Sequence, residues 1–146
     1  MDDMSTVLLV EDNPDDAELI AYAFSKAGIG NPIIVVDDGE KAMDYVQGRS
    51  AYADRREFPV PGIILLDLKL PRRSGFEVLE AVRATEATRR VPVIVLTSAN
   101  QEDDIRQAYD MGANSYLVKP ISRDALIAMA RSLDTFWIKL NKSVAS

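Results

Sequence analysis

Five short apolar runs, spaced along the whole chain, constrain the fold more than any other feature of the sequence. They are residues 6–10, 33–36, 63–66, 91–96 and 115–118. The runs are rich in Val, Ile and Leu without strict polar alternation, which is typical of strands covered on both faces. Stretches with helical periodicity separate them. This alternation predicts an α/β fold in which five helices surround a doubly wound, five-stranded parallel sheet with right-handed crossovers.

Local signals indicate where the helices begin. Asn13 and Pro14, followed by two aspartates, form an N-cap, a proline at the first position and acids at the positive end of the dipole. Ser74 and Glu77 have the spacing of a capping box. The other helices are expected to begin near residues 38–40, 100–103 and 122.

Size and charge narrow the function. The chain has 146 residues, which suits a single domain over residues 1–146. A net charge of −6 argues against nucleic-acid binding, which needs Lys and Arg to neutralise phosphates. No run of about 18 apolar residues exists to span a membrane. The acidic N-terminus lacks an apolar signal region, so we expect a cytoplasmic protein.

The sequence contains neither cysteine nor histidine. Disulfides, thiolate nucleophiles, the Ser-His-Asp triad and the usual zinc sites are therefore excluded. Any chemistry must use carboxylates, hydroxyls, lysine and a hard cation.

Two segments depart from a minimal alternating unit. Residues 47–61 are long for a helix-to-strand connection, and we expect a solvated insertion, with local packing as the alternative. The last helix is expected over about 122–141, because its apolar stripe is longer than one sheet face needs. The stripe consists of Leu126, Met129, Leu133, Phe136, Trp137 and Leu140.

Chemically useful side chains follow the predicted strands. Glu11 and Asp12 follow the first strand, and Asp67 follows the third. Thr97 follows the fourth strand and Lys119 the fifth. Ligands of doubly wound sheets bind beyond the carboxyl ends of the strands, and clustered carboxylates suit Mg²⁺. Asp67 is then a candidate nucleophile for phosphoryl transfer, with a hydroxyl and an ammonium group to stabilise the transferred group.

Each of these residues has a simpler explanation when taken alone. Glu11 and Asp12 can be capping acids, Thr97 can cap the next helix, and Lys119 can be a surface lysine. The conjunction at successive strand ends is what favours a site.

The chain resembles the receiver domain of bacterial two-component response regulators, from residue 7 to about residue 140. The resemblance rests on the order Glu11-Asp12, Asp67, Thr97 and Lys119-Pro120. It implies a flavodoxin-like three-layer sandwich with strand order 2-1-3-4-5. It also implies that a partner histidine kinase phosphorylates Asp67, and that the only chemistry is Mg²⁺-dependent phosphoryl acceptance and autodephosphorylation.

The resemblance also assigns roles to individual residues. It implies Mg²⁺, with Mn²⁺ or Ca²⁺ as substitutes, held by Asp12, Asp67 and the carbonyl of Lys69, with Glu11 acting mainly through water. Tyr116 matches the switch aromatic, which turns inward when Thr97 moves toward the phosphoryl group.

Within that family, the insertion and the late Phe136, Trp137 and Leu140 resemble stand-alone cyanobacterial phytochrome-associated regulators. This narrower resemblance implies a phytochrome as the kinase, a homodimer through the last helix, and no output domain. Packing of Phe136 and Trp137 within the chain is the alternative to an interface. An exposed aromatic pair favours the interface.

Other functions fit less well. A haloacid-dehalogenase-like phosphatase needs an acid two residues after Asp67, where this chain has Lys69. A flavodoxin-like cofactor binder needs a phosphate-cradling loop, but Glu11 and Asp12 would repel a phosphate. A transcription factor needs a DNA-binding unit, for which too few residues follow the last helix. The remaining alternative is a pseudo-receiver, an interaction module that is never phosphorylated.

Overall fold

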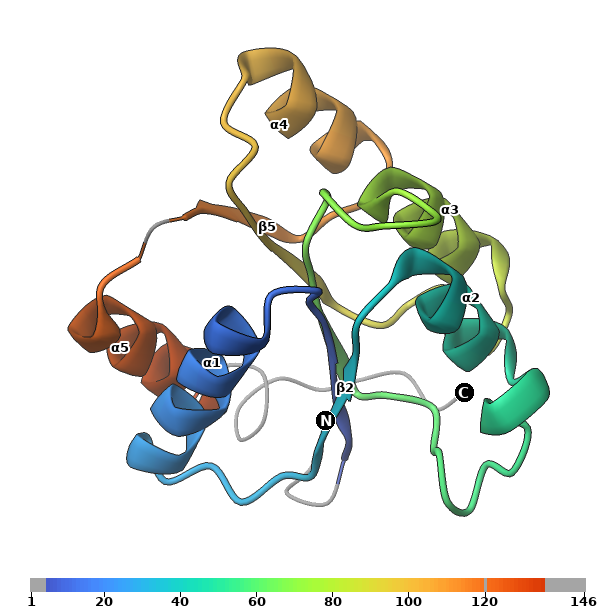
Figure 1. Ribbon diagram of the computed structural model, residues 1–146, viewed down its shortest axis with the longest axis horizontal. Helices are drawn as coiled ribbons and strands as arrows, with labels where there is room; N and C mark the ends of the chain where they lie inside the picture. Colours follow the sequence, from blue (N-terminus) through green and yellow to red (C-terminus); the bar gives the residue numbers. More distant parts are fainter. Residues whose placement is uncertain (1–4, 120, 136–146) are drawn as a thin grey trace.

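The computed structural model describes residues 5–119 and 121–135 and shows five parallel strands in one sheet (Figure 1). The strands are β1 (Val7–Val10), β2 (Ile33–Val36), β3 (Ile63–Leu66), β4 (Val93–Thr97) and β5 (Ser115–Val118). Their order is β2-β1-β3-β4-β5, and every neighbouring pair is parallel. The predicted fold class and strand order are confirmed.

Helices cover both faces of the sheet and make the three layers (Figure 1). They are α1 (Pro14–Lys26), α2 (Gly39–Gln47), α3 (Gly75–Ala84), α4 (Glu102–Asp110) and α5 (Arg123–Leu133). Alternate residues of the strands divide the core between the faces. Leu8 and Val10 pack with α2, α3 and α4, whereas Val7 and Leu9 pack with α1 and α5. All residues of β1 and β3 are buried, so the carboxyl ends of these central strands are rigidly placed.

The predicted starts of α1 and α3 are confirmed by their caps. The Asn13 side chain accepts the backbone N–H groups of Asp15 and Asp16 at 2.9 and 3.2 Å. Ser74 and Glu77 form both hydrogen bonds of a capping box. These caps matter for function because α1 and α3 begin directly after the loops that follow β1 and β3.

The fourth strand begins later than the prediction of residues 91–96 and ends one residue later, at Thr97. The backbone N–H of Val91 bonds to the carbonyl of Thr88 in a turn, and Pro92 has no N–H to give. Pairing with β3 therefore begins at Val93, and the Thr97 side chain projects from the strand itself.

The 47–61 segment packs locally through its aromatic side chains, as the alternative expectation has it, while eight of its 15 residues remain exposed. The Tyr52 and Phe58 rings lie 5.1 Å apart, and Tyr45 of α2 lies 5.1 and 6.0 Å from them. The Arg55 guanidinium donates to the carbonyls of Val46 and Phe58 and lies over the Tyr45 ring. The aromatic side chains make local packing more favourable than exposure.

The described part of the last helix, α5, ends at Leu133. The proposed extension to about 141 lies outside the described residues, as does Pro120. No helix in the described part of the chain has the length and apolar character needed to cross a membrane.

Candidate functional site: an acidic pocket at the carboxyl edge of the sheet

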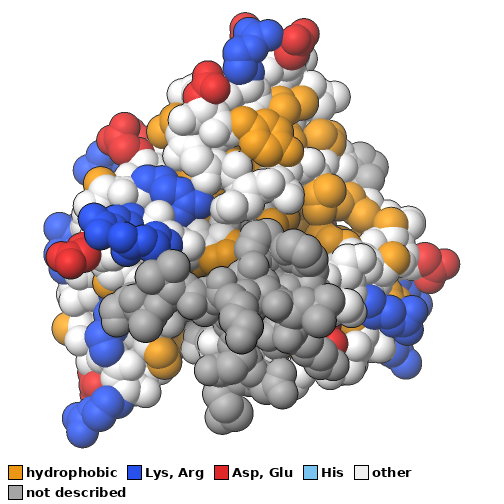
Figure 2. Space-filling model, turned by 180° about the vertical axis from the view of Figure 1, so that it is seen from behind, with side chains coloured by type: hydrophobic (Ala, Val, Ile, Leu, Met, Phe, Trp, Pro, Cys, Tyr) orange, Lys and Arg blue, Asp and Glu red, His pale blue; other side chains and the backbone are white. Residues whose placement is uncertain are grey.

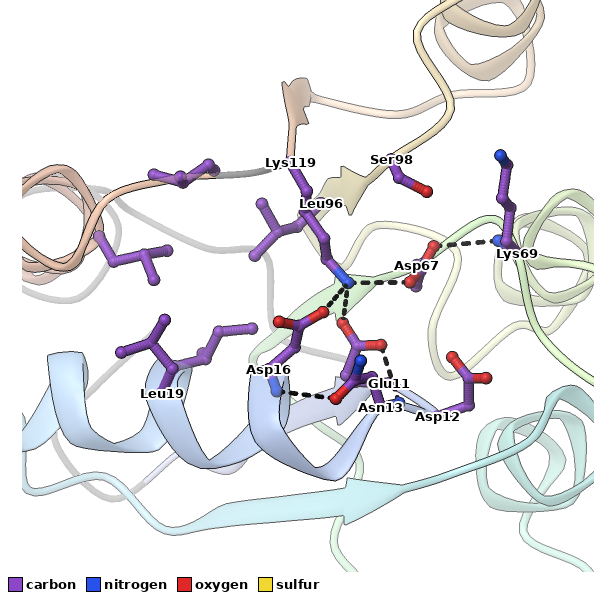
Figure 3. Close-up of a pocket in the computed structure, with 13 residues that line it drawn as sticks. Glu11, Asp12, Asn13, Asp16, Leu19, Asp67, Lys69, Leu96, Ser98 and Lys119 are labelled. Carbon is purple, nitrogen blue, oxygen red and sulfur yellow. Dashed lines mark hydrogen bonds and ion pairs between the residues drawn. The ribbon is translucent and has the colours of Figure 1, made fainter.

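The structure brings Glu11, Asp12, Asp67 and Lys119 together in one cavity of about 620 Å³ at the carboxyl edge of the sheet (Figure 3). Thr97 lies against the same group through its hydrogen bond to Asp67. The predicted convergence of side chains from four strand ends therefore agrees with the structure.

Both oxygens of the Asp67 carboxylate accept hydrogen bonds. Oδ1 accepts the Lys69 backbone N–H at 3.0 Å and the Thr97 hydroxyl at 2.6 Å. Oδ2 accepts the Lys119 ammonium at 3.0 Å. Asp67 is only 6% exposed, and a buried carboxylate requires such compensation. The donors therefore surround both oxygens, one of which would carry a transferred group.

Lys119 makes ion pairs with three carboxylates at once. Its ammonium contacts Glu11, reaches Asp67 at 3.0 Å and reaches Asp16 at 2.9 Å. The Lys119 backbone N–H continues the sheet by donating to the Thr97 carbonyl at 2.8 Å, which directs the side chain over the strand ends. The Asp16 contact was not predicted, because an acid in the first turn of a helix is already explained by the helix dipole.

Burial has opposite consequences for the two ends of the Glu11–Lys119 pair. Burial raises the pKa of Glu11 to about 7, although the hydrogen bond from Lys119 lowers it. Burial lowers the pKa of Lys119, but hydrogen bonds to the three carboxylates outweigh burial and raise that pKa above its ordinary value. Lys119 therefore remains a cation, outnumbered by the acids around it.

Glu11, Asp12 and Asp67 each offer a carboxylate oxygen within 4.8 Å of the others. Asp12 is exposed, whereas the other two are buried, so the group opens to solvent on the Asp12 side (Figure 3). Hard oxygen donors with room for retained water fit a small divalent cation such as Mg²⁺ or Mn²⁺. The backbone of Lys69 lies beside Asp67, and its carbonyl as a ligand stays a prediction.

A chain of hydrogen bonds joins Asp67 to Tyr116. Thr97 donates to Asp67 and accepts the Ala99 backbone N–H at 3.3 Å. The Ala99 carbonyl in turn accepts the Tyr116 hydroxyl at 2.7 Å. Tyr116 is half-buried, and burial raises its pKa above the ordinary value. The sequence indicated Asp67 and Tyr116 at the two ends of this chain. It gave no sign that Ala99 connects them, because Ala99 contributes only backbone atoms.

Gly75 lets α3 approach the backbone of Asp67. A Cβ at this position would lie 2.3 Å from the Asp67 carbonyl oxygen and 2.4 Å from the Leu68 Cα, too close for any side chain. The Gly75 N–H donates to the Leu68 carbonyl at 2.9 Å. This contact fixes the loop that presents Asp67.

Phe136, Trp137 and Leu140, predicted to form a dimer interface, lie outside the described residues.

Comparison with known proteins agrees with this geometry. The pattern of the response regulator receiver domain matches residues 7–131. The probable methanogenesis regulatory protein FilR2 of Methanothrix harundinacea is 38% identical over 147 residues, covering 97% of this chain and 89% of FilR2. Response regulator Rcp1 of Synechocystis sp. is 35% identical over 133 residues, covering 91% and 88%.

Solved structures give the same result. The phosphorylated cyanobacterial phytochrome response regulator RcpA superposes with a TM-score of 0.85 at 33% identity, covering 95% of this chain and 97% of RcpA. The Mn²⁺-bound form of Rcp1 has a TM-score of 0.83 at 33% identity, covering 97% and 99%.

Fold and site together define a receiver of phosphorelay signalling. The chain belongs to the response regulator receiver domain family, and phytochrome response regulators are among its similar structures.

Proposed function

We propose that this receiver accepts a phosphoryl group on Asp67 from a sensor histidine kinase. The observation that carries the proposal is the environment of the Asp67 carboxylate. Donors from Lys69, Thr97 and Lys119 engage both of its oxygens, and two further carboxylates lie within metal-sharing distance. A buried carboxylate with this arrangement can bind a cation and a transferred anion side by side.

The transfer itself requires little covalent chemistry from the protein. A carboxylate oxygen of Asp67 forms a bond to phosphorus as the bond between phosphorus and the kinase's histidine nitrogen breaks. The imidazole keeps the electron pair and takes up a proton. Lys119 and the Thr97 hydroxyl remain within reach of the oxygens that carry the developing charge, and this positioning supplies the catalysis.

The proposed cofactor is Mg²⁺, held by Asp12, Asp67, the Lys69 carbonyl and, mainly through water, Glu11. The carboxylate cluster and the Mn²⁺-bound form of the similar protein Rcp1 support this assignment. When bound, the cation supplies positive charge that offsets the repulsion between the acids and the incoming phosphoryl group. Mn²⁺ and Ca²⁺ are proposed substitutes.

The proposed output is a switch between two arrangements of Thr97 and Tyr116. Phosphorylation adds charge and acceptor oxygens beside Thr97, and the hydrogen bonds through Ala99 carry a displacement of Thr97 to Tyr116 on β5. The affected surface is formed by α4, β5 and α5. Tyr109 and Val118 on this surface are 47% and 37% exposed, and Figure 2 shows hydrophobic side chains gathered below α4.

The proposed kinase is a phytochrome, which the similarity to RcpA supports. Homodimerisation through the last helix also stays a proposal, because Phe136, Trp137 and Leu140 lie outside the described part of the chain.

Phosphorylation by a small donor tests the central proposal. We expect the intact mass to increase by one phosphoryl group after incubation with acetyl phosphate and Mg²⁺, and to remain unchanged with Asp67→Asn or without a divalent cation. Asp110→Asn, at an exposed position on α4, is the matched control and should be phosphorylated like the wild type. A wild type that gains no phosphoryl group would favour the pseudo-receiver.

A further inference from the structure

Among the described partners of the Lys119 ammonium, Asp16 is the one that does not come from a strand end. Its carboxylate lies 2.9 Å from the Lys119 ammonium, across the cavity from Asp67 (Figure 3). The side chains differ in exposure, at 1% for Glu11, 7% for Asp67 and 38% for Asp16. Only the Asp16 carboxylate is therefore substantially hydrated while it holds the lysine.

The start of α1 determines the position of Asp16. The Asn13 side chain fixes the first turn by accepting the N–H groups of both Asp15 and Asp16. Asp16 then points over the sheet edge toward Lys119, whereas Asp15 lines a separate surface groove with Tyr22. Two neighbouring acids with the same helix-dipole role thus have different environments, and only Asp16 lies in the phosphorylation site.

We infer that Asp16 is a positioning residue that competes with the phosphoryl group for Lys119 and so lowers the affinity of the site for that group. The inference rests on the proposed function, because the phosphoryl group is the competitor.

The number of donors on Lys119 creates the competition. An ammonium group has three N–H donors, and Glu11, Asp16 and Asp67 accept from all of them. A phosphoryl group on Asp67 replaces the single carboxylate charge with about two negative charges, a net gain of about one, and adds three acceptor oxygens. The donor that Asp67 held can pass to one phosphoryl oxygen, and any further contact between Lys119 and the phosphoryl group requires Glu11 or Asp16 to give up a donor.

Desolvation costs indicate which contact weakens. Releasing Glu11 would leave a buried carboxylate without its cation, which is strongly unfavourable. Releasing Asp16 returns a partly exposed carboxylate to water at small cost. Asp16 is thus the partner that Lys119 exchanges for the phosphoryl group, and the exchange lowers the net gain from binding that group.

Beryllofluoride, an analogue of the phosphoryl group, measures this competition at equilibrium. We expect Asp16→Asn to bind it more tightly than the wild type by roughly two- to fivefold in the presence of Mg²⁺, the range expected for a partly exposed ion pair. Asp15→Asn, which removes the same charge from the same helical turn, should bind like the wild type. Titration calorimetry gives both affinities, and Asp16→Glu should restore weaker binding.

A double-mutant cycle separates competition for Lys119 from a general charge effect. In the Lys119→Gln background, Asp16→Asn should no longer tighten beryllofluoride binding, because the shared partner is absent. Equal gains for Asp15→Asn and Asp16→Asn, or a gain that persists without Lys119, would overturn the inference while leaving the proposed function intact. A wild type that neither binds beryllofluoride nor accepts a phosphoryl group would contradict both.

Discussion

Lys119 and Arg83 are two partly buried cations that hold opposite edges of the same sheet. Lys119 follows β5 at the carboxyl edge and binds carboxylates. Arg83, at the end of α3, binds the segments that lead into β4 and β5 at the amino edge. Both residues link several segments of the chain, but the acceptors of Lys119 are charged and those of Arg83 are neutral.

The Arg83 guanidinium has only neutral acceptors among its described hydrogen bonds. It donates to the carbonyls of Gly112, Arg89 and Val91 and to the Asn114 side chain, at 2.6 to 3.2 Å. Burial lowers its pKa, although an arginine remains charged. Because the acceptors are neutral, the Arg83 cluster has no excess negative charge that would attract a further cation. We call the cluster complete in this sense.

The Lys119 cluster is incomplete in this sense, because it carries more negative than positive charge. One cation faces Glu11, Asp16 and Asp67, with Asp12 close to two of them. We expect this excess negative charge to lower the stability of the folded protein and to favour binding of the proposed divalent cation. Neutral acceptors at one edge are thus expected to stabilise the fold, whereas the excess charge at the other edge supports the proposed binding site.

The largest expected effect is on the complete cluster. Arg83→Ala should lower the free energy of unfolding by about 3 kcal/mol, because several partly buried carbonyls lose their donors at about 1 kcal/mol each. Urea denaturation gives the value, and Arg90→Ala, at an exposed neighbouring position, is the control. The folded Arg83→Ala variant should still be phosphorylated by acetyl phosphate. A variant that is as stable as the wild type but accepts no phosphoryl group would contradict the proposal that Arg83 supports the fold and Lys119 the site.

The sequence predicted the sheet and the main site residues because their signals are local. An apolar run ending at Asp67, or Lys119 at the end of another run, can be identified without knowing the contacts. Asp16 and Arg83 were missed for a physical reason. Asp16 contacts a residue 103 positions away, and Arg83 binds mainly backbone carbonyls, which have no sequence signature.

The insertion shows a different limit of the sequence. Tyr52 and Phe58 are separated by residues of mixed character, so no periodic pattern indicates that they pack together. Their shared partner is Tyr45, whose hydroxyl also donates to the Pro59 carbonyl at 2.8 Å. Packing of this kind depends on tertiary proximity, which length and composition do not encode.

An intermediate effect is expected when one charge is removed from the incomplete cluster. Asp67→Asn should raise the free energy of unfolding by about 1 kcal/mol without divalent cations, because repulsion with Glu11 and Asp12 is relieved. The amide oxygen can still accept from Lys69 and Thr97, and Lys119, which loses its acceptor on Asp67, keeps Glu11 and Asp16. Mg²⁺ should stabilise the wild type and not this variant, since a cation stabilises only the state that binds it. Thermal unfolding with and without Mg²⁺ measures both effects, and a less stable variant in chelator would contradict the excess-charge explanation.

The smallest expected effect is that of salt, and it separates the two clusters most directly. In chelator, raising NaCl from about 0.05 to about 0.5 M shortens the Debye length to a few ångströms and screens the acids near exposed Asp12. The stability difference between Asp67→Asn and the wild type should therefore shrink by about 0.5 kcal/mol. This is half of the repulsion of about 1 kcal/mol that the substitution relieves. The difference between Arg83→Ala and the wild type should stay constant, because hydrogen bonds to neutral carbonyls are not screened. Urea titrations at both salt concentrations give the two differences, and parallel changes would mean that charge does not distinguish the two edges of the sheet.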